Sequence, residues 1–131
     1  METIRGNTQI KDDTLEDVAW TNYGATSTVV GWSSTTQKVI YYKKVGKLVF
    51  VTFAISGTSD SASTSFTLPY AVSNLVQIDL VIRAVDSGSY IYGLMEIGAS
   101  SVANFYTTLA GVAWTASGTK TIIGQFWYES A

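Results

Sequence analysis

The sequence predicts an all-β protein, an antiparallel two-sheet sandwich of jelly-roll type preceded by a short extended N-terminal arm. Three observations predict it. Gly, Ser and Asp turn signals recur about every ten residues after Trp20. Between these turns, apolar and polar residues alternate with the period of two that is typical of strands. The first 17 residues hold seven of the 18 charged residues, in a chain of 131 residues that is 47% apolar.

The clearest strand is VQIDLVIRAV, where Ile78, Ile82 and Ala84 share one face and Asp79 and Arg83 share the other. The stretch from Leu48 to Ile55 is instead apolar on both faces at first, which indicates a central sandwich strand or a strand covered by another subunit. Val45-Gly46 predicts a tight turn before it. Further strands are expected at Thr28 to Ser33, Gln37 to Lys44, Ser63 to Leu68, Tyr90 to Ile97, Val102 to Leu109 and Thr119 to Glu129.

Residues 1–18 are interpreted as an arm and residues 19–131 as the body. The apolar residues of the arm, Ile4, Ile10, Leu15 and Val18, are too sparse to build a core. An arm of this composition orders on binding a partner. The alternatives are a frayed terminus and an N-terminal strand that completes the sandwich.

The composition excludes several function classes. The chain has no Cys and no His, which removes Ser-His-Asp and Cys-His catalysis and nearly all zinc sites. With a net charge of −2 and no basic patch, we expect no nucleic-acid binding. No apolar run reaches the roughly 18 residues of a membrane span, and the first 18 residues lack an apolar leader segment, so we expect a chain made in the cytoplasm without membrane insertion.

No carboxylate pattern points to an enzyme or to a metal site. The acidic cluster Asp12, Asp13, Glu16 and Asp17 lacks the spacing of a calcium loop. The carboxylates of the body show no pair of the kind that glycoside hydrolysis needs. We therefore expect no catalytic residues, no metal and no cofactor.

Aromatic residues are the better recognition candidates, because sugars stack on exposed Trp and Tyr rings. Trp114 lies between expected strands and is a candidate for a loop-borne ligand contact, and Tyr90 and Tyr92 share a strand face. The remaining large aromatics are more simply interpreted as core: Trp32, Trp127, Phe50, Phe53 and Phe66. Lys43, Lys44 and Lys47 surround the expected turn, either keeping its tip soluble or contacting an anionic glycan or an acidic neighbour.

Three stretches carry a resemblance to a known class of protein. IRGNTQIKDDTLEDV resembles a short "G-x-Q-I-x-D-G-T-I-x-x-x-x-L" linker near the start of fibre and spike proteins of tailed bacteriophages. The matching residues are Gly6, Gln9, Ile10, Lys11, Asp12, Thr14 and Leu15, with Asp13 in place of the usual Gly. The body is similar to C-terminal domains of such virion proteins, most specifically in YYKKVGKLVFV-x-F-x-ISGTS-x-S-x-S-x-x-FTLPY and also in WTASGTKTIIGQFWYE.

The resemblance implies a non-enzymatic virion protein: a head or tail fibre, spike or capsid decoration protein. Its arm would attach to capsid, collar or tail through Ile4, Gln9, Ile10, Leu15 and Val18. Because such proteins are commonly trimers, the resemblance also implies a homotrimer, with Leu48, Phe50 and Thr52 as the candidate subunit interface and a cell-surface glycan as a further partner. The alternative is a stand-alone carbohydrate-binding module; a small glycan hydrolase has the least support.

Overall fold

The computed structural model describes residues 18–74, 77–98 and 100–131, and within them every regular element is a strand. The all-β prediction is confirmed. The strands are β1 (Thr21–Asn22), β2 (Val29–Val30), β3 (Trp32–Val45), β4 (Leu48–Ser59), β5 (Ser65–Thr67), β6 (Ile78–Asp86), β7 (Ser89–Ile97), β8 (Val102–Tyr106) and β9 (Thr119–Glu129). Across the described ranges no helix is long and apolar enough to cross a membrane.

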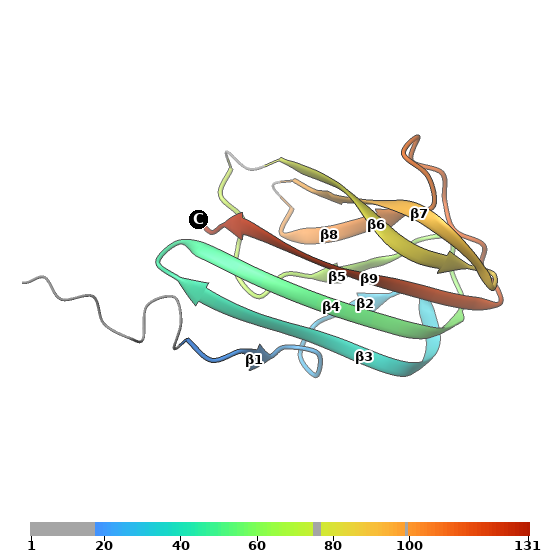
Figure 1. The fold of residues 1–131 in the computed structure, drawn as a ribbon, viewed down its shortest axis with the longest axis horizontal. Helices are drawn as coiled ribbons and strands as arrows, with labels where there is room; N and C mark the ends of the chain where they lie inside the picture. The colour runs from blue at the N-terminus through green and yellow to red at the C-terminus, as the bar shows by residue number, and fades with distance from the viewer. Residues whose placement is uncertain (1–17, 75–76, 99) are drawn as a thin grey trace, which may run out of the picture.

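The described strands pair in one antiparallel sheet with the order β1-β3-β4-β9-β6-β7-β8-β5-β2. The sheet curls, so that β5 and β2 lie behind β4 and β9 (Figure 1). Ring contacts join the two halves, since Phe53 of β4 lies 5.3 Å from Phe66 of β5 and 5.4 Å from Phe105 of β8. The predicted division into two separate sheets is not confirmed by this continuous pairing.

The core follows from the alternation along each strand. On β4, Val49, Val51, Phe53 and Ile55 are all at most 2% exposed. On β9, Phe126 and Tyr128 point inward, and Phe126 completes the aromatic centre 6.1 Å from Phe53. One face of β4 and β9 is therefore buried, and the other face of the same strands is left outside the core.

Two tight turns set the register of the long hairpins. Asp86 pairs with Ser89, so Ser87-Gly88 forms the turn between β6 and β7, and both residues have the positive φ (49° and 85°) that favours such turns. Val45 pairs with Leu48, which makes Gly46-Lys47 the turn between β3 and β4. The turn predicted at Val45-Gly46 is thus displaced by one residue, because Val45 remains in the ladder.

The predicted arm lies almost wholly outside the described residues. Ile4, Gln9, Ile10 and Leu15 fall in residues 1–17, and their anchoring role stays a prediction. Val18 is described and is half-buried. The body begins with β1, a two-residue strand that the sequence did not predict and that pairs with Tyr41 and Tyr42 of β3.

Candidate functional site: the open face of the sheet

The outer surface of β3, β4, β9, β6 and β7 is the candidate site, and we call it the open face. Its rows follow from the register: Lys43 of β3 lies beside Phe50 of β4, which lies beside Trp127 of β9. Two rows further along, Ile123 of β9 lies between Ala54 of β4 and Arg83 of β6. Exposed large side chains occur along this face, including Trp127 at 60%, Val81 at 55% and Ile123 at 47% exposure. No other described strand covers it.

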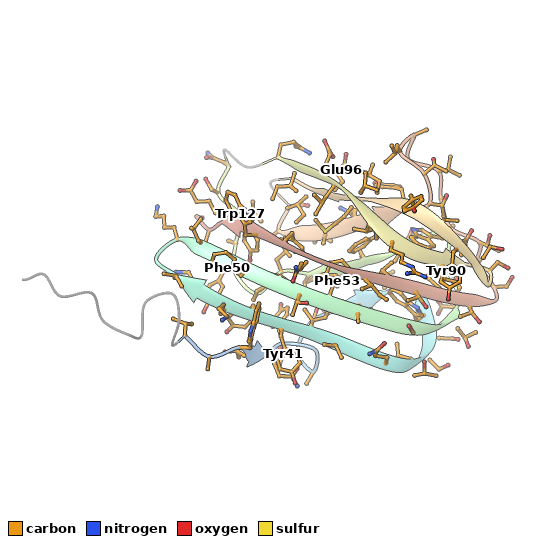
Figure 2. All side chains as sticks on the ribbon, in the orientation of Figure 1. Tyr41, Phe50, Phe53, Tyr90, Glu96 and Trp127 are labelled. Carbon is orange, nitrogen blue, oxygen red and sulfur yellow. The ribbon has the colours of Figure 1, made fainter. Side chains whose placement is uncertain are left out.

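At the end near the β3–β4 turn, the open face carries a cluster of apolar side chains that we call the apolar patch: Trp20, Val45, Phe50 and Trp127. Together with Lys43 and Gln125 they line a hollow of about 420 Å³. The Lys43 ammonium lies 4.6 Å from the centre of the Trp20 ring, a cation–π contact that fixes Trp20 at the edge of the patch. Phe50 and Trp127 sit side by side on neighbouring strands (Figure 2).

The predicted subunit-interface residues Leu48, Phe50 and Thr52 lie in one line along β4, on the open face. Leu48 is 38% exposed, and the other two are half-buried by their neighbours on the same sheet. The structure therefore brings them together on an accessible surface beside Trp127. Their role in subunit contact stays a prediction.

The interpretation of Trp127 as a core residue is wrong, because Phe126 and Tyr128 take the inward positions and alternation turns Trp127 outward. Phe50 likewise faces away from the core that Phe53 fills. Phe53 and Phe66 are core residues as predicted. Trp32 packs at the margin of the core, half-buried.

At the opposite end of the open face lies a second cluster, the tyrosine patch, made of Arg83, Tyr90 and Tyr92. Tyr90 and Tyr92 are the predicted ligand-binding pair, and they are 73% and 78% exposed. Arg83 pairs across the ladder with Tyr92, and its guanidinium carbon lies 4.6 Å from the centre of the Tyr90 ring. The three residues line a shallow hollow of about 370 Å³.

The third predicted ligand residue, Trp114, is placed differently. It is on a loop as expected, but its side chain is only 4% exposed and its indole N–H donates a hydrogen bond to the Phe105 carbonyl at 2.9 Å. The ring closes the end of the core between β8 and β9, so it offers no platform to a ligand.

Lys120, which the sequence analysis did not single out, is completely buried. Its ammonium donates hydrogen bonds to the carbonyls of Gly31 and Ser61, both at 3.0 Å, and to the Thr64 hydroxyl at 2.7 Å. The rings of Trp32 and Trp114 lie 5.2 and 5.4 Å from it. Burial lowers the pKa of Lys120 to about 8, against the opposing attraction of Asp60 and Asp86.

The contacts of Lys120 assign it a structural role. It ties the loops before β3, before β5 and before β9 to one point. The sequence did hold a sign that Lys120 is buried. Side chains alternate between the two faces of a strand, and Lys120 lies an even number of residues from the inward residues Ile122, Phe126 and Tyr128.

Carboxylates on the described strands form one close pair by register. Asp79 of β6 lies directly opposite Glu96 of β7, a juxtaposition that the sequence analysis missed. Neither residue lines a hollow described above. In the described part of the chain no group of three or more Asp, Glu, His or Cys residues is arranged to hold a metal ion.

The lysines around the β3–β4 turn have separate contacts. Lys44 donates a hydrogen bond to the Gly46 carbonyl at 2.6 Å and lies 5.2 Å from the Tyr70 ring, whereas Lys43 contacts Trp20. Lys47 is exposed at the turn itself. These contacts spread the lysines over different sides of the hairpin rather than joining them in one anion site.

Comparison with known proteins adds no family to this description: no protein-family model and no curated protein matches the chain.

Proposed function

We propose that this chain is a non-enzymatic structural protein of a bacteriophage particle: a head or tail fibre, spike or capsid decoration protein. Residues 1–18 attach it to the capsid, collar or tail, and the curled sheet is its jelly-roll-like projecting body. Copies of the body associate, as a homotrimer, through the apolar patch. The proposal rests on the sequence resemblance for its setting and on the apolar patch for its mode of action.

The observation that carries the proposal is the exposure of Trp20 and Trp127, at 45% and 60%, on a face that the fold leaves open. The two side chains alone expose on the order of 250 Å², given the ~250 Å² that a large aromatic residue can bury. A stable interface takes about 800 Å² from each partner, and its centre is enriched in such aromatic residues. An exposed patch of this kind marks an interaction surface.

The charges at the rim of the patch suit a second copy of the same chain as the partner. Lys43 lies in the patch, and Glu129 lies opposite Leu48 at its border. Because both signs are present, two or three copies can place opposite charges against one another without net repulsion.

A second candidate function, a stand-alone carbohydrate-binding module, is favoured by the exposed tyrosine patch. This function accounts for the exposure of Tyr90 and Tyr92, but it gives no role to the apolar patch at the other end of the open face. A hydrolase is the least supported, since it would depend on Asp79 and Glu96, and neither lines the hollows of the apolar patch or of the tyrosine patch.

Deleting residues 1–17 tests the attachment part of the proposal. The buried core cluster is built from residue 40 onward, so the shortened chain should keep its fold and melting temperature. The bacteriophage that encodes the chain should then assemble particles without it. Normal incorporation of the shortened protein would overturn the assignment of residues 1–18 as the attachment arm.

A further inference from the structure

The tyrosine patch has the geometry of a small recognition platform. Tyr90 and Tyr92 point the same way from β7, about 7 Å apart along the strand. Both rings are more than two-thirds exposed, and the Arg83 guanidinium lies against one of them. A guanidinium laid on an aromatic ring is held in place while its remaining N–H groups stay free to donate.

The positive charge of Arg83 has no partner in the described structure. No ion pair involving Arg83 is formed by any described carboxylate. Its neighbours on the same face, Ile123 of β9 and Val81 and Val85 of β6, are uncharged. Asp86, at the end of the same strand, is engaged elsewhere, because its two oxygens accept hydrogen bonds from the backbone N–H and hydroxyl of Thr115, both at 3.0 Å.

We propose that the tyrosine patch binds a carboxylate-bearing saccharide. The Tyr90 and Tyr92 rings stack on the apolar faces of sugar rings, and Arg83 pairs with the carboxylate in the bidentate geometry that a guanidinium favours. In the setting of the proposed function the saccharide belongs to a cell surface, and only that setting rests on the proposed function. The binding itself depends on the three side chains alone.

Three features favour an acidic saccharide over other anions. The hollow is lined by two mostly exposed rings, which suits the apolar face of a sugar ring rather than an inserted peptide side chain. The two phenol hydroxyls offer donors and acceptors at the rim for sugar hydroxyl groups. A nucleic acid would need a wider positive surface, whereas Arg83 is a single charge on a chain of net charge −2.

The tyrosine patch lies well apart from the apolar patch, so the two can act independently. On β9, the residue in the same row as Tyr90 is Thr121, because Val85 of β6 pairs with both of them. Trp127 lies six residues further along β9, a distance of about 20 Å. Figure 2 shows Tyr90 and Trp127 at opposite ends of the sheet.

The test is calorimetric titration of the full-length chain with three acidic probes: tetragalacturonate, a hyaluronan tetrasaccharide and sialyllactose. Methyl-esterified tetragalacturonate, the methyl-esterified hyaluronan tetrasaccharide and lactose are the uncharged counterparts. Binding is expected for at least one acidic probe and should be at least about tenfold weaker for its uncharged counterpart. Arg83→Gln and Tyr92→Ser should each weaken binding about tenfold or more. Arg83→Lys should weaken it less than Arg83→Gln, since lysine keeps the charge but loses the bidentate geometry, and Tyr92→Phe should retain most of it. Leu109→Ser, at a 64% exposed apolar residue outside both patches, is the matched control.

The proposal is overturned if none of the acidic probes binds at millimolar concentration. It is also overturned if the charged and uncharged probes bind equally, or if Arg83→Gln and Tyr92→Ser bind as the unaltered chain does. Tetraglutamate is titrated as a fourth probe. If it binds in a way that needs Tyr92 while no saccharide binds, the ligand of the tyrosine patch is an acidic peptide and the saccharide proposal is overturned. Association between copies is measured separately by light scattering, so failure of this site and failure of the proposed function are distinguishable.

Discussion

Trp127 of β9 lies directly beside Phe50 of β4, and both side chains project from the face of the sheet opposite the core. The adjacent inward residues Phe126 and Val51 also pair with one another, inside the protein. At this point β4 and β9 therefore carry apolar side chains on both the outer and the inner face of the sheet. A sheet face of this kind is stable when a second surface covers it.

Phe50→Glu should therefore abolish association between copies while preserving the fold. The carboxylate would lie in the centre of the apolar patch, where burying it without a partner is costly. Sedimentation velocity should show a loss of the associated species, and circular dichroism should show unchanged strand content. Leu109→Glu places the same charge at an exposed apolar residue of the 107–118 loop and should leave association intact. Persistent association of the Phe50→Glu chain would place the subunit contact elsewhere.

Trp114 and Trp127, whose exposure the sequence analysis predicted wrongly, should differ in how strongly the same substitution lowers the free energy of unfolding. Trp114→Phe removes the indole N–H that bonds the Phe105 carbonyl and leaves a void in the core, so it should lower the free energy of unfolding by about 2–3 kcal/mol. Trp127→Phe should change that free energy by less than about 0.5 kcal/mol, because the ring is mostly exposed. Urea unfolding of the two variants makes the comparison, with both substitutions placed in the Phe50→Glu chain, which is expected to be monomeric. Equal losses would contradict the inward placement of Trp114.

Most strands could be predicted from sequence because alternation reports which residues share a face. The ranges of β4, β6, β7 and β9 differ from the expected ones by a few residues at most. Alternation does not say which face is covered, and Trp127 and Phe50 were therefore assigned to the core. Trp114 lies in a loop, where no period exists, and its burial depends on the tertiary contact with Phe105. The strand β1 is only two residues long, too short to show a pattern.

Lys120 shows a further limit of predicting burial from sequence, because a charged residue is by default expected on the surface. Only the three oxygen acceptors from distant loops make its burial possible. Lys120→Met should lower the free energy of unfolding by about 2 kcal/mol, since the Thr64 hydroxyl and two carbonyls lose a charged donor. Thermal and urea unfolding measure this loss. Lys38→Met, at an exposed lysine of β3, is the control and should be nearly neutral. A similarly neutral Lys120→Met would refute the structural role assigned to Lys120.

Stability should rise with pH in the range where Lys120 loses its proton. Its pKa is about 8 in the folded chain and about 10.5 in an unfolded one, so between these values the unfolded chain binds more protons. The free energy of unfolding should accordingly increase by about 2 kcal/mol from pH 7.5 to pH 9.5, at about 1.4 kcal/mol per pH unit once folded Lys120 is neutral. The Lys120→Met chain should lack this rise. A flat profile for the unaltered chain would show that Lys120 keeps its ordinary pKa.

Above this range the slope should reverse because of Tyr128. Burial raises the pKa of Tyr128 to about 12 from its ordinary 10.0, so the unfolded chain loses this proton first and stability falls as pH rises past 10. Tyr128→Phe should weaken the fall. It also removes the hydroxyl that donates to the Tyr70 carbonyl at 2.9 Å. The two profiles can be compared by urea unfolding at pH 10.5 and pH 11.5, where the Tyr128 contribution outweighs the remaining contribution of Lys120, and equal slopes would exclude Tyr128 as the cause.

The most direct test of the account is the absolute mass of the unaltered full-length chain in solution, measured by light scattering on a sizing column. One protomer has a mass of 14.1 kDa. The account predicts a stable species of three protomers that persists on dilution. A single protomer at every accessible concentration would contradict it, and would show that the patch around Phe50 and Trp127 does not join copies of this chain in solution.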